Sequence, residues 1–162
     1  MNQELQALFG QDQNDRQQDL PAGRLLARDR LRRDKVDELI AAGALRVGAD
    51  YYHAAMIFQH GTERRHYWRA HLLARRGAEL GHAGARWLTA ASYDRWLVAG
   101  GLPQRYGTQY QLLADRWVPL ATDPGTTDAE RAIWNVPPLA RQAGGEMAGG
   151  EMAGSEGEDG AR

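Results

Sequence analysis

Glycine ends four successive segments of this chain whose apolar residues recur with the period of an α-helix. Glycine adopts the left-handed conformation that closes a helix at little steric cost, so each one predicts a C-terminus. An earlier helix is indicated by Leu5, Leu8 and Phe9, which share one face. Asp50 and Thr62 are expected as N-caps. The glycine-ended helices are expected over residues 24–42, 51–60, 63–80 and 83–99, closed by Gly43, Gly61, Gly81 and Gly100-Gly101.

The pattern changes after these helices from a helical period to that of strands. Residues 108–113 and 116–121 are typical of two short strands around Ala114-Asp115. Thr127 and Glu130 form a capping-box pattern that begins a short helix. The predicted fold is mainly α, with about five helices packed as antiparallel hairpins and a short two-stranded β-hairpin near the C-terminus. We expect a single helical domain over residues 1–142. The acidic, glycine-rich tail over 143–162 is expected to be disordered, because it has too few large apolar groups to offset its ordering entropy.

Composition narrows the classes of function. The 162 residues carry 20 basic and 21 acidic groups, a net charge of −1, so we expect no nucleic-acid partner. No apolar run approaches the ~20 residues of a membrane helix, so we expect no membrane association and a cytoplasmic location. The absence of cysteine excludes disulfides and thiolate chemistry. Nothing in the pattern indicates an oligomeric state.

Two pairs of charged residues fall on the apolar stripes of the first two predicted helices. Asp12 and Arg16 have the i, i+4 spacing of a favourable ion pair. Either they pair inside the protein, or Gly10 frays the helix and leaves them in solvent. Asp29 and Arg32 lie on the second stripe, where we favour a guanidinium in water with its stem along apolar surface.

Polar residues also share the apolar faces of the later helices. Gln59 lies on the stripe of the third helix and needs a partner there, while His60 ends that helix. His71 is the only polar member of the next stripe. Asp94 and Arg95 stand beside apolar neighbours in the fifth helix, so structural pairing and ligand binding both remain open. Because each unpaired buried polar group costs roughly 1–3 kcal/mol, we expect the inward groups to converge on one cavity.

The loop over residues 102–110 carries more amides, hydroxyls and rings than a turn requires. Gln104, Tyr106, Thr108 and Gln109 are expected to orient a ligand. Because Gly107 lets the loop fold back over the helix ends, the two glutamines and the tyrosine are also expected to close the mouth of the cavity.

Four motifs in this order resemble a bacterial family known only as a domain of unknown function. They are DQNDR at 12–16, QHG at 59–61, DR at 94–95 and PQRYGTQ at 103–109. The resemblance spans residues 5–139 and implies the same site residues, but no reaction.

Two functions remain open. In the first, the protein is an enzyme acting on a small polar or anionic substrate, with His60 or His71 as general acid/base held by Asp94 or Asp12. The residues expected to bind the substrate are Arg16, Gln59, Arg95, Gln104, Tyr106, Thr108 and Gln109. In the second, it is a non-catalytic helical-hairpin module whose loop and hairpin bind a peptide or partner protein. We expect no cofactor and assign no metal, although a metal variant of the enzyme hypothesis would use His60, His71 and a carboxylate.

Overall fold

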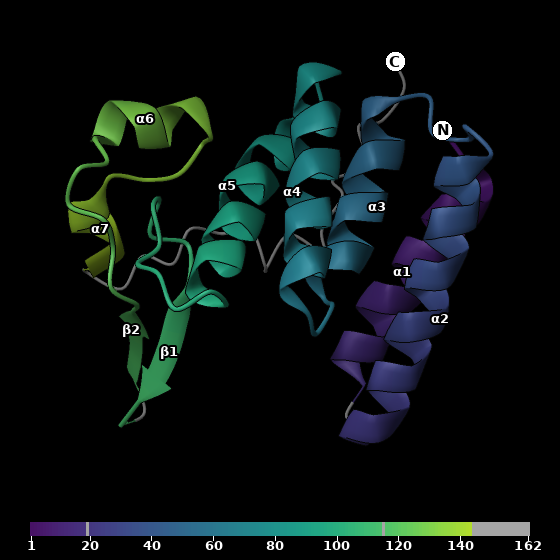
Figure 1. Cartoon of the computed structure of the whole chain (residues 1–162), viewed down its shortest axis with the longest axis horizontal. Helices are drawn as coiled ribbons and strands as arrows, with labels where there is room; N and C mark the ends of the chain where they lie inside the picture. Colours follow the sequence, from purple (N-terminus) through teal and green to yellow (C-terminus); the bar gives the residue numbers. More distant parts are fainter. Residues whose placement is uncertain (19, 115, 144–162) are drawn as a thin grey trace, which may run out of the picture.

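The computed structural model describes residues 1–18, 20–114 and 116–143, which form a mainly α-helical fold (Figure 1). The five long helices are α1 (Gln3–Gln17), α2 (Ala22–Ala41), α3 (Gly48–Gln59), α4 (Arg64–Glu79) and α5 (Ala83–Val98). They are followed by β1 (Tyr110–Leu113), β2 (Arg116–Pro119), α6 (Asp128–Ile133) and α7 (Leu139–Ala143). The predicted fold class is therefore confirmed, and α7 is an addition that the sequence pattern does not indicate.

The long helices stand side by side, with α3 in the middle (Figure 1). α1 and α2 form a hairpin on one side of α3, while α4 packs on its other side and carries α5. α3 contacts each of the other four long helices. Its sequence suits this position, because it is apolar nearly all round and leaves little face for solvent. The fully buried apolar residues are Leu5, Val36, Ala54, Ala55, Ile57, Ala70, Ala74, Ala85, Leu88 and Ala90.

α3 and α4 approach each other closely at two glycines. A Cβ added at Gly48 would lie 3.0 Å from the carbonyl oxygen of Gly77, and one added at Gly77 would lie 3.1 Å from that of Gly48. Ala70 and Ala74 continue this small-residue face along α4 and are fully buried. The opposite, C-terminal end of α3 lies between α1 and α5, because His60 contacts Asp12 and Arg95 contacts Gln59.

The predicted C-terminal glycines end their helices. Gly43 and Gly81 have φ values of 63° and 85°, in the left-handed region that favours glycine. Gly101, with φ of 75°, closes the turn after α5. Gly10 instead lies within α1, which continues to Gln17. One glycine in a helix interior costs only about 1 kcal/mol, and α1 is held on both sides of Gly10 by the buried residues Leu5, Asp12 and Asp15.

Two predicted N-caps are wrong. α3 begins two residues before Asp50, whose carboxylate accepts hydrogen bonds from the backbone N–H of Arg46 and Val47 at 2.8 and 3.1 Å. Asp50 thus accepts hydrogen bonds from the residues before the helix while lying in its first turn, where a negative charge also interacts favourably with the helix dipole. The N-cap of α4 is Glu63 and not Thr62.

The C-terminal elements agree with their predicted types. The strands pair antiparallel from Tyr110 opposite Pro119 to Leu113 opposite Arg116, and are shorter than predicted. The capping box of α6 is present, because Thr127 N donates to Glu130 Oε2 at 2.8 Å and Glu130 N donates to Thr127 Oγ1 at 3.2 Å.

The sequence also predicted a disordered tail and no membrane-spanning helix. The tail expected over 143–162 lies outside the described residues, apart from Ala143 at the end of α7. Within the described ranges, no helix combines the length and the apolar character needed to cross a bilayer.

Candidate functional site

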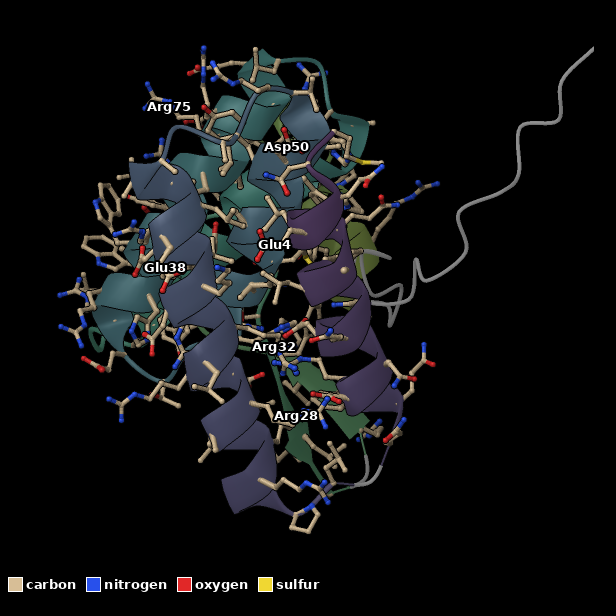
Figure 2. The ribbon with its side chains drawn as sticks, turned by 90° about the vertical axis from the view of Figure 1, so that its right-hand side faces the viewer. Glu4, Arg28, Arg32, Glu38, Asp50 and Arg75 are labelled. Carbon is tan, nitrogen blue, oxygen red and sulfur yellow. The ribbon has the colours of Figure 1, made fainter. Side chains whose placement is uncertain are left out.

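Three carboxylates and three guanidinium groups meet between α1 and α2. We call this group the ion cluster: Asp12, Asp15, Arg16, Arg28, Asp29 and Arg32. Arg32 lies at its centre, with Nη1 2.6 Å from Asp15 Oδ2, Nε 3.6 Å from Asp12 Oδ1 and Nη2 against Asp29. Figure 2 shows Arg28 and Arg32 between the two helices. The formal charges balance, which allows the cluster to be buried.

The ion cluster decides between the two interpretations of Asp12 and Arg16. Arg16 Nη1 lies 3.4 Å from Asp12 Oδ1, and Arg16 Nη2 lies 3.1 Å from Asp29 Oδ2. The inward ion pair is therefore confirmed, and fraying at Gly10 is wrong. The favoured interpretation of Arg32 is also wrong, because this residue is 3% exposed. Three carboxylates on two helices surround its guanidinium and replace the water that we expected there.

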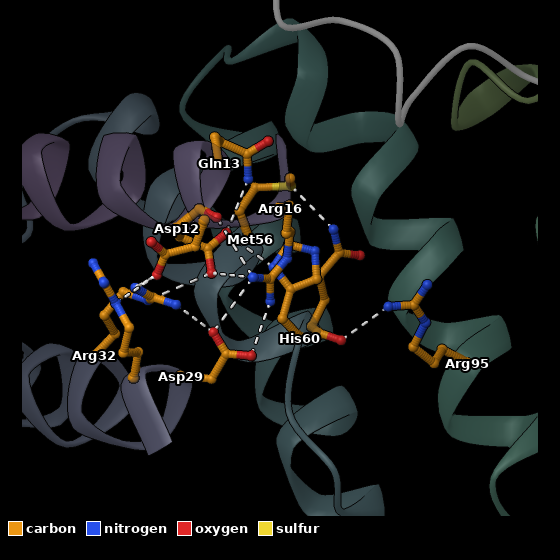
Figure 3. A network of polar contacts seen from close by, with 11 residues as sticks. Asp12, Gln13, Arg16, Asp29, Arg32, Met56, His60 and Arg95 are labelled. Carbon is orange, nitrogen blue, oxygen red and sulfur yellow. Dashed lines mark hydrogen bonds and ion pairs between the residues drawn. The ribbon is translucent and has the colours of Figure 1, made fainter. Parts of the chain in front are cut away.

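His60 joins the ion cluster from the end of α3 (Figure 3). Its Nδ1 lies 2.9 Å from Asp12 Oδ2, and its side chain is 12% exposed. Because a carboxylate accepts hydrogen bonds, this contact places the proton of a neutral ring on Nδ1 and leaves the lone pair on Nε2. No hydrogen bond to Nε2 is found from any described residue. The Asp12–His60 pair therefore has the geometry of an oriented histidine.

A cavity of 480 Å³ lies beside this pair and is lined from α1 to α5. We call it the polar cavity after the charged and amide side chains in its lining, although apolar groups, among them Leu25, Leu26 and Val98, make up most of its surface. Four predicted site residues line it, namely Arg16, Gln59, His60 and Arg95, together with Asp29, Gly61 and Tyr67. Arg95 Nη1 donates to the carbonyl oxygen of Gln59 at 2.9 Å (Figure 3). The Gln59 side chain, which needed a partner, donates to Met56 Sδ at 3.1 Å. Side chains from distant parts of the sequence thus converge here.

Asp94 does not line the polar cavity, and its carboxylate instead holds the loop over 102–110. It accepts hydrogen bonds from the backbone N–H of Arg105, Tyr106 and Thr108 at 2.7, 2.9 and 3.0 Å. The hydroxyl of Thr108 adds a fourth at 2.8 Å. Burial raises the pKa of Asp94, and these hydrogen bonds oppose the rise. Its predicted role as the partner of a catalytic histidine is not supported, because its contacts are with the loop.

The loop residues likewise form contacts within the protein. Gln104 is fully buried, donates to Gln109 O and Leu120 O at 3.0 and 2.9 Å, and accepts from Gln109 N at 2.7 Å. Gln109 Oε1 accepts from Arg95 Nε at 3.2 Å. Tyr106 packs on Tyr93 with ring centroids 6.3 Å apart.

Consequently the loop does not close the mouth of the polar cavity. Gln104, Tyr106, Thr108 and Gln109 are absent from its lining. Only Gln109 reaches a lining residue, through its contact with Arg95. The prediction fails because amides and hydroxyls that could meet a ligand satisfy the backbone of the loop itself.

His71 lies apart from the other predicted site residues, in an aromatic group on α4 and α5. Its Nδ1 is 2.9 Å from the carbonyl oxygen of Thr89, and its ring stacks on Trp68 with centroids 5.2 Å apart. The ring centroids of His71 and Tyr93 are 5.1 Å apart. The expectation that His71 shares the cavity is therefore wrong, and its hydrogen bond is that of a satisfied packing residue.

We predict that His71 makes the protein less stable at acidic pH. Burial lowers the pKa of its imidazole. Below about pH 6.5 the unfolded chain takes up a proton that the folded protein binds only at lower pH. The free energy of unfolding should therefore fall as the pH drops through this window. In His71→Gln the fall should be smaller by up to about 1.4 kcal/mol per pH unit, as measured by urea unfolding from pH 7.5 to 5. Identical pH profiles for the two proteins would contradict this assignment.

Several residues of the site were not among those predicted from the sequence. Asp15 follows Asp12 by three positions and Arg28 precedes Arg32 by four, so helical spacing placed each beside a residue already identified. Arg131 is buried at 2% exposure and donates to Tyr106 O at 3.2 Å, which fixes the loop from α6. No sequence signal pointed to it, because arginine in a short helix usually faces solvent.

The comparisons with known proteins add no function. No family model matched the chain, and neither the curated proteins nor the solved structures contained a match. Over the described ranges, no group of three or more histidine, aspartate or glutamate side chains has an arrangement that could hold a metal ion.

Proposed function

We propose that the polar cavity binds a small anionic molecule and that His60 exchanges a proton with it as a general acid/base. The observation that carries this proposal is the 2.9 Å contact between His60 Nδ1 and Asp12 Oδ2, at the edge of a cavity that Arg16 and Arg95 also line. On this proposal the protein is an enzyme of the acid–base type.

The charges of the polar cavity favour an anion. Arg16, Arg95 and Asp29 line it; the charge of Arg16 is balanced within the ion cluster by Asp12 and Asp29, so the positive charge offered to a ligand comes from Arg95. Guanidinium groups bind carboxylate and phosphate groups through paired hydrogen bonds. The volume of 480 Å³ falls within the range of about 300–1,000 Å³ that is common for small-molecule sites. A substrate with an anionic group therefore suits both the size and the charge.

The proton chemistry follows from the tautomer of His60. With Nδ1–H donated to Asp12, the lone pair on Nε2 can take a proton from a bound molecule. The imidazolium that forms is stabilised by the Asp12 carboxylate, and Nε2 later returns the proton. Asp12 is itself held by Arg16 and Arg32. It therefore acts as a positioning residue, since its fixed carboxylate keeps the imidazole in one orientation.

The motif resemblance points to the same residues. Three of the four motifs, at 12–16, 59–61 and 94–95, contribute side chains to the lining of the polar cavity. The fourth, at 103–109, reaches it through Gln109 and Arg95. This convergence supports a site shared by the motifs, and it leaves the substrate to be found by experiment.

The test uses protein whose histidines are labelled with ¹⁵N, so that the His60 ring can be followed by NMR. Small anions are added to it one at a time: inorganic phosphate, malonate, succinate and 2-oxo acids. We expect at least one to bind with a Kd between about 10 µM and 1 mM and to shift the His60 ring signals. Arg95→Gln should abolish the shift. Arg86→Gln is the matched control, because Arg86 is exposed on the same helix and does not line the polar cavity.

Catalysis is tested separately from binding by incubating the binding anions in D₂O. If His60 removes a proton from carbon, deuterium enters that position from solvent, and His60→Gln should abolish the exchange while retaining binding. If every anion leaves the His60 signals unchanged, the proposal is wrong and the Asp12–His60 pair only fixes the packing of α1 on α3.

A further inference from the structure

A second and larger hollow shares Leu26 with the polar cavity and otherwise has its own lining residues. It is a groove of 1,120 Å³ between α2 and α4, with Phe58 of α3 in its lining. Leu26 and Leu72 stand on its two walls and are each 48% exposed, and Trp68 is 39% exposed. Apolar side chains left open to water along a groove are typical of a surface that binds a partner. We call this hollow the α2–α4 groove.

One buried charge in the α2–α4 groove is not compensated. Arg33 lines the groove, is 8% exposed, and has an Nη1 atom that is fully enclosed. Among the residues that the structure describes, this atom has no hydrogen-bond partner and Arg33 forms no ion pair. Burying a cation without a partner is costly. Because Nη1 is enclosed, the guanidinium must turn outward to meet a carboxylate that enters the groove, and this contact relieves the cost.

The other charges of the α2–α4 groove do not supply that carboxylate. Asp37 pairs with Arg69 across the groove, and Glu63 lies 2.9 Å from Arg65. Within the described chain, five arginines and three carboxylates line the groove, and Glu79 outside the lining pairs with Arg76 at 3.2 Å, which leaves an excess of one positive charge. Burial, and secondarily the charge of Arg33, lower the pKa of the neighbouring His66, so this ring adds no positive charge near neutral pH. The groove is therefore apolar and cationic at once.

The dimensions of the α2–α4 groove match a helix and exceed those of a small molecule. Its wall on α2 runs from Leu26 to Ile40, about 21 Å at 1.5 Å per residue. Its wall on α4 runs from Glu63 to Arg76, about 20 Å. The volume of 1,120 Å³ is above the range of about 300–1,000 Å³ for small-molecule pockets. Two parallel walls of this length accommodate a helix of roughly 14 residues.

We propose that the α2–α4 groove binds an acidic amphipathic helix of a partner protein. Its apolar face packs on Leu26, Trp68 and Leu72, which are the exposed apolar residues of the lining, and one of its carboxylates pairs with Arg33. This is the helix-in-groove mode of recognition, in which apolar residues at i, i+3, i+4 and i+7 fill the groove and charged residues fix the register. The site is separate from the Asp12–His60 pair, so it stands or falls independently of the proposed acid–base chemistry.

The test uses the full chain and a fluorescein-labelled 14-residue helical peptide with leucine along one face and glutamate elsewhere. A matched peptide carries glutamine in place of glutamate. We expect the acidic peptide to bind with a Kd in the micromolar range and the glutamine peptide to bind about tenfold or more weakly, as measured by fluorescence anisotropy. Binding of the acidic peptide should weaken as NaCl is raised.

Two variants of the protein locate the binding. Arg33→Gln should raise the Kd of the acidic peptide about tenfold and leave the Kd of the glutamine peptide nearly unchanged, because only the acidic peptide offers a carboxylate. It should fold normally, since it removes an unpaired buried charge. Arg24→Gln, on an exposed residue of the same helix outside the groove, should bind like the wild type.

The apolar wall is tested by Leu72→Asp, which should raise the Kd of both peptides about tenfold or more. The control is Leu31→Asp, because Leu31 is 68% exposed on α2 and does not line the groove. Equal binding of both peptides, or unchanged binding to Arg33→Gln and Leu72→Asp, would overturn the proposal. So would a dimer in light scattering that Leu72→Asp dissociates, since a second copy would then occupy the groove.

Discussion

Replacing Arg32 with methionine should destabilise the folded protein by about 3–5 kcal/mol, measured as the free energy of urea unfolding at pH 7. Arg32 is 3% exposed and contacts Asp12, Asp15 and Asp29. Methionine fills part of the volume but leaves these carboxylates without their central cation. Against a total stability of about 5–15 kcal/mol for a domain of this kind, such a loss makes the variant marginal.

The matched control is Arg28→Met in the same helix. Arg28 Nε also contacts a cluster carboxylate, Asp15, at 2.8 Å, but its side chain is 40% exposed. Exposed ion pairs contribute about 0–1 kcal/mol, so this change should cost less than 1 kcal/mol. Similar losses for the two variants would show that the ion cluster is solvated in the native state and that burial of Arg32 does not stabilise it.

Replacing Asp94 with alanine should destabilise the protein by about 3 kcal/mol. The Asp94 carboxylate accepts hydrogen bonds from Arg105 N, Tyr106 N, Thr108 N and Thr108 Oγ1. Alanine removes the acceptor and leaves these donors unsatisfied beside α5. The measurement is again urea unfolding, together with the amide signals of the loop in an NMR spectrum.

Thr108→Val provides the comparison for Asp94→Ala. It removes the one hydroxyl bond to Asp94, at 2.8 Å, and keeps the three backbone bonds. It should therefore cost about 1 kcal/mol. If Asp94→Ala lowered the free energy of unfolding no more than Thr108→Val, the Asp94 carboxylate would not be what holds the loop in place.

The helices could be predicted because their signals are local. The apolar stripes of α2 and α5 and the glycines after α2 and α4 lie within a few residues of the structure they determine. The Asp12–Arg16 pair could be predicted for the same reason, since its i, i+4 spacing is set by one helix. Gln59 and Arg95 were identified from their place on buried stripes, and they do meet at the polar cavity.

The errors concern partners that lie on different elements. Arg32 was expected in water because arginine stems often lie along apolar surface, whereas two of the carboxylates around its guanidinium, Asp12 and Asp15, come from α1. Asp94 was expected beside a histidine, yet its partners are backbone N–H groups of a loop more than ten residues away. Periodicity specifies which face of a helix is buried, but not which side chain of another helix it meets.

The position of α3 has a consequence for the order in which the protein opens. Because α3 alone contacts all four other long helices, its amide hydrogens should exchange with solvent only through global unfolding. The hairpin of β1 and β2 makes few contacts with the helices, so its amides should exchange through smaller, local openings. The chain would then behave as a stable helical unit carrying a less stable appendage, and hydrogen exchange would separate the two without any mutation.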